Sequence, residues 1–300
     1  SMLIGEDYQI TLLNDGKELL DKLPEMMPDL IILDLMMPQI DGFEVCRRLK
    51  KHSQFQHIPI ILVTVMDGAK ALTRGLVEAG ADIIETNSFN GTSIAAADYQ
   101  MEEYVYRINF ESARLARMVA EEYQQKDGKM RWVAGAIGPT NRTASMSPDV
   151  ENPAYRNIRY AELVEAYKEA AMALLDGGAD LLLVETIFDS LNAKAAIFAI
   201  KELEKERGTE IPLMISGTIT DASGRTLSGQ TVSAFWNSMR HANPLSIGLN
   251  CALGADQLRQ YVLELSQQSK VYVSAYPNAG LPNEFGEYDD SPELLAEHIA

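Results

Sequence analysis

The sequence contains little cysteine, few histidines and no long apolar run. Its 300 residues include two cysteines and four histidines, so the disulfide framework of a small secreted domain is not expected. Apolar runs such as residues 30–33 and 58–63 fall far short of the roughly 20 residues that cross a bilayer. No signal-peptide pattern opens the chain. We therefore expect a cytoplasmic protein without a membrane partner.

Positive charge is scarce as well. Lysine and arginine total 26 against 43 aspartate and glutamate residues, which gives a formal net charge of −17. Such a balance opposes binding to phosphate backbones, and nucleic acid is not expected as a partner. Apolar residues make up 46% of the chain, enough to bury the core of one large α/β domain or of two ordinary ones.

Short β-branched runs alternate with amphipathic helical stretches along most of the chain. This alternation predicts parallel strands joined by helical crossovers. A further candidate strand at residues 8–13 precedes a helical pattern at Leu19, Leu20 and Leu23. Eight strands are predicted near residues 30–35, 58–65, 82–87, 132–137, 181–186, 213–218, 245–250 and 271–275.

A short pattern occurs twice and singles out two glutamates. Glu78-Ala-Gly-Ala-Asp82 precedes Glu85, and Asp176-Gly-Gly-Ala-Asp180 precedes Glu185. The second copy follows a helix predicted at residues 160–175, which Gly177 and Gly178 end. Each glutamate therefore stands at the C-terminal end of a strand, the edge where ligands bind in parallel α/β folds. Both are candidate site residues, with a loop salt bridge as the alternative.

The first part of the chain resembles a response-regulator receiver. The motif is Pro28-Asp-Leu-Ile-Ile-Leu-Asp34-Leu-Met-Met-Pro38-Gln-Ile-Asp41-Gly42, and the resemblance covers about residues 3–76. It implies that Asp34 is the phosphoacceptor. Receivers also need an acidic pair for magnesium and a lysine after the fifth strand, and neither is found at the matching positions. Phosphoryl transfer to a carboxylate needs those charges, so we expect Asp34 to be inert.

Residues 77–300 resemble the homocysteine-binding domain of cobalamin-dependent methionine synthase. That domain is a TIM-type (βα)₈ barrel in which zinc, held by three cysteines, binds the homocysteine thiolate. The thiolate takes a methyl group from methylcobalamin carried on a separate domain. The resemblance rests on Ala81-Asp-Ile-Ile-Glu-Thr-Asn87, Gly138-Pro-Thr-Asn-Arg-Thr-Ala144, Glu185-Thr-Ile-Phe-Asp189, the run from Ser216 to Gly229, Gly248-Leu-Asn-Cys251 and Pro277-Asn-Ala-Gly-Leu-Pro-Asn283.

The resemblance implies roles for individual residues. Cys251 would be a zinc ligand, and coordination to zinc deprotonates a bound thiol while leaving its sulfur nucleophilic. A carboxylate suits the substrate ammonium. The residues that would bind homocysteine or shape its pocket are Glu85, Asn87, Glu185, Asp189, Ser216 and Asn250.

The chain departs from this family in two places. The other two zinc cysteines, which belong to a Gly-Gly-Cys-Cys-Gly motif on the last barrel strand, are not in the sequence, and neither is the first strand with its glycine-rich loop. A tight zinc site needs three or four protein ligands, so we expect weak zinc binding and impaired methyl transfer. Both ends read as cut. Strands 30–35 and 58–65 could fill the gap in the ring, which predicts one hybrid barrel with a possible ninth strand at residues 8–13.

Two other functions stay open at this stage. The chain could be a phosphorelay receiver that uses the barrel as its output module. It could also be an engineered or accidental chimera of a receiver segment, residues 1–76, and a barrel segment, residues 77–300, with no activity of its own.

Overall fold

A computed structural model of the chain describes residues 80–220 and 223–278 without a break. Before residue 80 it describes residues 11, 13, 15–28, 31–34, 45, 48–49, 52, 54–55, 58, 60–63 and 77. The chain divides into two compact units, Ser1–Gly75 and Leu76–Ala300.

The first unit contains one helix and a pair of parallel strands. Helix α1, Gly16–Met26, begins at Asp15, whose carboxylate accepts the backbone N–H of Glu18 at 2.8 Å, the usual N-cap arrangement. Strand β1, Ile31–Asp34, pairs in parallel with strand β2, Ile60–Val63. Their small core consists of Leu19, Leu23, Ile31, Val45, Leu49, Phe55 and Ile58. Helix and strands lie where they were predicted, although two parallel strands do not by themselves identify a receiver.

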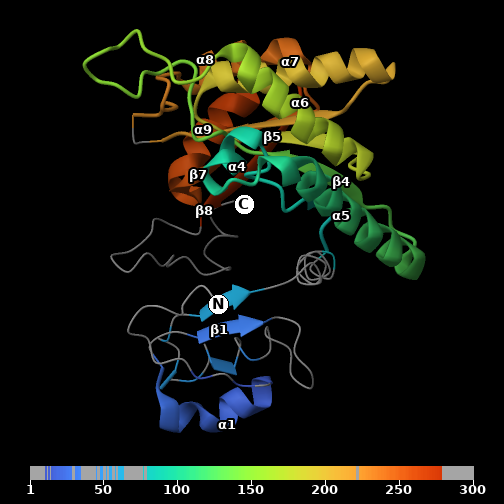
Figure 1. The fold of residues 1–300 in the computed structure, drawn as a ribbon. Helices are drawn as coiled ribbons and strands as arrows, with labels where there is room; N and C mark the ends of the chain where they lie inside the picture. The colour runs from blue at the N-terminus through green and yellow to red at the C-terminus, as the bar shows by residue number, and fades with distance from the viewer. Residues whose placement is uncertain are drawn as a thin grey trace. The chain divides into compact units, whose positions relative to one another are not determined.

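The second unit is built on a parallel six-stranded sheet (Figure 1). Its strands lie side by side in the order of the sequence, which is the topology of a (βα)₈ barrel and gives a curled half-barrel here. All six lie where strands were predicted. They are β3 Ile83–Glu85, β4 Trp132–Ile137, β5 Leu181–Ile187, β6 Leu213–Gly217, β7 Ser246–Gly254 and β8 Tyr272–Asn278.

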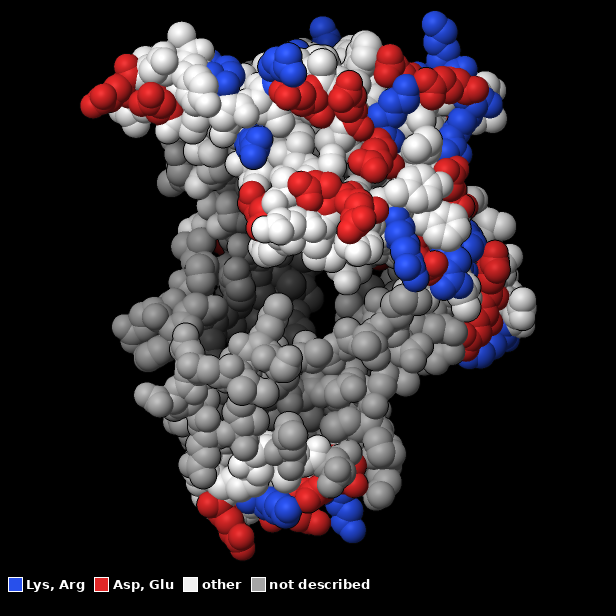
Figure 2. Space-filling view, viewed as in Figure 1, with Lys and Arg blue, Asp and Glu red and all other residues white. Residues whose placement is uncertain are grey.

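Helices connect these strands and cover the sheet. Helix α6 confirms the helix predicted at residues 160–175, and Gly178 follows it with a φ of +102°, a conformation that glycine adopts without a steric cost. The helices are α4 Ser93–Ala96, α5 Val105–Asp127, α6 Tyr160–Asp176, α7 Ser190–Arg207, α8 Val232–Met239 and α9 Ala255–Gln268, with 3₁₀ turns η1 Ala97–Tyr99, η2 Glu102–Tyr104 and η3 Arg240–Ala242. Figure 2 shows acidic and basic side chains interspersed on their outer surface.

The main core lies between the sheet and the helices. Along β5, Leu182 and Val184 belong to this core, whereas Leu181 and Leu183 belong to a separate small cluster with Ala134. The alternation follows from the two-residue period of a strand. Burying one such leucine contributes about 1.5–3 kcal/mol. Packing of the helix-facing residues against the helices therefore contributes most of the apolar burial that stabilises the sheet.

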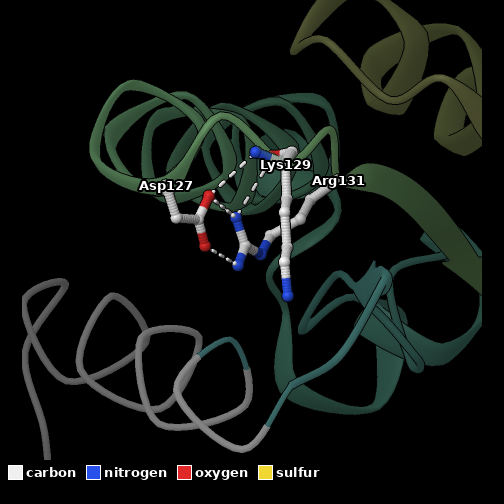
Figure 3. A network of polar contacts seen from close by, with 3 residues as sticks. All are labelled: Asp127, Lys129 and Arg131. Atoms are coloured by element: carbon white, nitrogen blue, oxygen red, sulfur yellow. Dashed lines mark hydrogen bonds and ion pairs between the residues drawn. The ribbon is translucent and has the colours of Figure 1, made fainter.

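A charged network closes the turn between α5 and β4 (Figure 3). The guanidinium of Arg131 donates to both carboxylate oxygens of Asp127, at 3.0 and 2.6 Å, and the backbone N–H of Lys129 donates to the same carboxylate at 2.9 Å. Chiefly because of the Arg131 hydrogen bond, the pKa of Asp127 lies well below its usual value. The bidentate geometry fixes the entry into β4.

Strands β7 and β8 come close together at Gly248. A Cβ atom added there would lie 2.3 Å from the carbonyl oxygen of Ser274 on β8. Only a residue without a side chain fits such an approach. Two residues further along the same strands, Asn250 pairs with Tyr276.

Two predictions fall beyond what these residues show. Most of the candidate strand at residues 8–13 lies outside the described residues, as does the end of the chain from residue 279. The merging of β1 and β2 with the half-barrel into one ring stays a prediction. Within the part of the chain that the structure covers, no helix is long and apolar enough to span a membrane.

Candidate active site

Two carboxylates occupy the C-terminal edge of the half-barrel. Glu85 is the last residue of β3 and is exposed, whereas Glu185 lies near the end of β5 and is only 5% exposed. Neither forms an ion pair with another residue that the structure describes. The salt-bridge alternative therefore has no partner in this part of the chain.

Burial and like charge act together on Glu185. Desolvation first, and the negative charge of Glu85 second, raise the pKa of Glu185 to about 8. A side-chain contact with Glu85 also contributes to this shift, but the Oε1 atom is buried and has no partner within hydrogen-bond distance among the described residues. An unpaired acceptor of this kind is costly in a folded protein. A group that carries N–H donors and a positive charge has the chemistry to satisfy it.

Two hydroxyls contact the other oxygen of Glu185. Tyr276 on β8 donates to Oε2 at 3.3 Å, and Thr186 Oγ1 lies 3.5 Å from the same atom. Burial raises the pKa of Tyr276, and the charge of Glu185 raises it further. The tyrosine therefore stays protonated and acts as a donor.

Asn250 joins this group to the rest of the edge. Its side chain is fully buried, and its Oδ1 accepts from Ser216 Oγ at 2.6 Å and from the backbone N–H of Thr186 at 3.2 Å. Its Nδ2 donates to Thr186 Oγ1 at 2.8 Å and to Cys251 Sγ at 3.0 Å. Both the oxygen and the nitrogen of the amide thus have partners, and strands β5, β6 and β7 are tied together.

Cys251 lies on the same edge and is partly exposed. Its Sγ lies 4.0 Å from Thr186 Oγ1. The pairing of β5 shifts register between Val184 and Ile187, and that of β7 shifts between Asn250 and Gly254. Such irregularities redirect side chains near functional sites. They bring the sulfur of Cys251 to the site instead of into the apolar core.

Backbone strain is concentrated at these two irregularities. Thr186, Cys251 and Ala252 have φ values of 53°, 59° and 58°. Non-glycine residues seldom adopt this left-handed region, and a β-branched threonine does so least readily. Strain of this kind often accompanies functional sites.

The remaining predicted residues occupy other positions. The Asp189 carboxylate caps α7, accepting from the backbone N–H groups of Leu191 and Asn192 and from Ser145 N and Oγ. These hydrogen bonds occupy both oxygens of the carboxylate. Asn87 is exposed two residues beyond Glu85. Asp34 ends strand β1 in the first unit.

Sequence reasoning missed Tyr276 and the strained conformation of Thr186. Tyr276 stands one residue beyond the predicted strand 271–275, on the face of Ser274, so two-residue periodicity could have placed it inside the barrel. A left-handed threonine leaves no mark in a sequence, because its residue type argues against the conformation.

The residues present do not fit the zinc set of the resembled family. No group of three or more His, Cys, Asp or Glu side chains that could hold a metal ion occurs within the described parts of the chain. The whole sequence has only two cysteines, whereas a three-cysteine site needs one more. The described residues therefore do not form the three-cysteine zinc site of that family.

Comparisons with known proteins agree with this fold. The family model for homocysteine S-methyltransferase matches residues 28–300, which include part of the receiver-like segment. The metallated form of the homocysteine methyltransferase MmuM from Escherichia coli is similar in structure, with a TM-score of 0.58 and 20% identity over 91% of each chain. Its oxidized form gives a TM-score of 0.59 and 20% identity over 88% of this chain and 86% of that one. The structural likeness shows the fold, and the family match shows that this chain belongs to the homocysteine S-methyltransferases.

Proposed function

We propose that the C-terminal edge of the half-barrel binds homocysteine, with its ammonium at Glu85 and Glu185 and its sulfur beside Cys251. The observation that carries this proposal is the buried, unpartnered Oε1 of Glu185 next to a second carboxylate. An ammonium supplies the missing donor and neutralises the repulsion between the two acids.

The spacing of the site suits a thiol amino acid. Thr186 Oγ1 lies within 4.0 Å of the Cys251 sulfur and within 3.5 Å of a Glu185 oxygen. Two carbons of the side chain separate the sulfur of homocysteine from its α-carbon, so the molecule can reach from the thiol to the carboxylates. A charge-assisted hydrogen bond there contributes about 1.5–3 kcal/mol.

The proposal also extends to the methyl donor. The sequence motifs favour a methionine-synthase type enzyme that takes the methyl group from methylcobalamin on a separate domain. With one cysteine at the site, we propose weak zinc binding and impaired methyl transfer. Zinc content after gel filtration, measured with and without chelator, tests this, and a stoichiometric chelator-resistant metal would contradict it.

Calorimetric titration with homocysteine under reducing, metal-free conditions tests binding directly. We expect saturable binding that Glu185→Gln weakens by roughly tenfold or more. Glu210→Gln is a matched acid-to-amide control, because Glu210 is exposed and lies outside the site. Equal affinity of the Glu185→Gln variant and the unmodified protein would overturn the proposal.

We also propose that the first unit derives from a receiver segment and is inert in phosphotransfer. The observation that favours a receiver origin is Asp34 at the C-terminal end of a parallel strand. Labelling with acetyl phosphate, compared between the unmodified chain and Asp34→Asn, tests inertness. A label that depends on Asp34 would instead favour a signalling role.

A further inference from the structure

The Cys251 sulfur is placed for a reaction that needs no metal. It is partly exposed, accepts the Asn250 Nδ2 hydrogen bond at 3.0 Å and lies beside the Thr186 hydroxyl. The family uses cysteines at this edge to hold a metal, but one cysteine does not complete that set. A thiolate without a metal is a nucleophile toward disulfides.

We infer that Cys251 captures the symmetrical disulfide of homocysteine, homocystine, as a mixed disulfide, with the ammonium of the captured half held by Glu85 and Glu185. This inference rests on the proposed function, because it uses the same ammonium site. The independent observation beside the cysteine is the buried Glu185 Oε1, which lacks a hydrogen-bond partner within the described residues.

The step balances without a further reactant. The Cys251 thiolate attacks one sulfur of homocystine, a Cys251–homocysteine S–S bond forms, and the S–S bond of homocystine breaks. The second half leaves as homocysteine thiolate and takes a proton from water. Cys251 is oxidised to the disulfide level, and one sulfur of homocystine is reduced to a thiol.

Charge gives the reaction its selectivity. Homocystine carries an ammonium on each half, which the two carboxylates attract, whereas bis(2-hydroxyethyl) disulfide carries none. Hydrogen bonds from Tyr276 and Thr186 occupy only Oε2 of Glu185, which leaves Oε1 for the ligand. We therefore expect the rate with homocystine to exceed the rate with the neutral disulfide by roughly tenfold or more.

The test follows adduct formation by intact-protein mass spectrometry in chelator, with peptide mapping to locate the modified cysteine. Cys46→Ser leaves Cys251 as the single cysteine and should retain the homocystine adduct, whereas Cys251→Ser should lose it. Glu185→Gln should abolish the preference for homocystine, measured as the ratio of its rate to the rate with bis(2-hydroxyethyl) disulfide in the same variant. An adduct confined to Cys46, or an unchanged preference in Glu185→Gln, would refute the inference.

A second measurement needs no variant. In the unmodified protein, homoserine should slow modification of Cys251 by homocystine, and 4-hydroxybutyrate, which lacks the ammonium, should not. Equal protection by the two would overturn the inference even if Glu185→Gln failed to fold. If homocysteine binds in the calorimeter but no adduct forms on Cys251, the inference fails and the proposed function stands. If neither occurs, both fail.

Discussion

The two faces of the six-stranded sheet differ in how completely their groups are satisfied. The helix-facing residues form one apolar core that includes Leu182, Val184 and Ile215. The inward face carries Glu185 and Asn250 at its C-terminal edge, and a buried oxygen there lacks a partner in the described structure. One face stabilises the fold, and the other keeps groups available for a ligand. Alternate residues of the same strands therefore perform different tasks.

Truncating the helix-facing side should have the largest effect. Leu182 is fully buried, so Leu182→Ala should lower the free energy of unfolding by about 2–5 kcal/mol. Homocysteine affinity of the folded variant should not change, because the side chain points away from the site. Denaturant unfolding and calorimetry measure the two quantities. A large loss of affinity with intact folding would show that the two faces are not independent.

A substitution on the inward face should instead lower homocysteine affinity without lowering stability. Glu185→Gln removes the charge at nearly constant volume, and homocysteine affinity should fall by about 1.5–3 kcal/mol, or roughly 10- to 100-fold. The free energy of unfolding near pH 8 should not fall, since the desolvation of Glu185 and its repulsion by Glu85 are relieved. A variant that is less stable and binds normally would contradict the assignment.

The pH dependence of stability gives a smaller effect. The folded pKa of Glu185 is raised from 4.5 to about 8, so between these values the folded state binds more protons than the unfolded state. The free energy of unfolding should therefore fall as pH rises through this window, by about 1–2 kcal/mol after solvent screening.

The matched control for that titration is Glu185→Gln, in which this component of the pH slope should be lost. Binding of an ammonium favours the ionised carboxylate. Homocysteine binding near pH 7 should therefore release protons, and calorimetry in buffers of different ionisation enthalpy measures this release. A slope that persists in the variant would place the titrating group elsewhere.

The smallest effect is expected at Thr186. Thr186→Gly relieves a left-handed φ of 53° but removes a hydroxyl that Asn250 contacts. The two effects nearly offset each other, and the change should lie within about 1 kcal/mol. Thr186→Ala keeps the strain and loses the hydroxyl, so it should be the less stable of the two. The opposite order in denaturant unfolding would argue against strain at this position.

Periodicity predicted most of the fold and only part of the site. The strands were found because apolar runs alternate with helical stretches, and Glu85 and Glu185 were found because each ends a strand. Tyr276 was missed because the predicted strand stopped one residue early. The hydrogen bonds of Asn250 depend on register shifts in β5 and β7, and these arise from contacts between strands that no local pattern reports.

The close approach at Gly248 sets a limit on how this site can be altered. Any side chain there would meet the Ser274 backbone and push β8 away from β7. Asn250 and Tyr276 are paired two residues further along these strands. The displacement would therefore separate Tyr276, which donates to Glu185, from Asn250, which donates to Cys251. The absence of a Cβ atom at Gly248 therefore sets the distance between the carboxylate end and the sulfur end of the site.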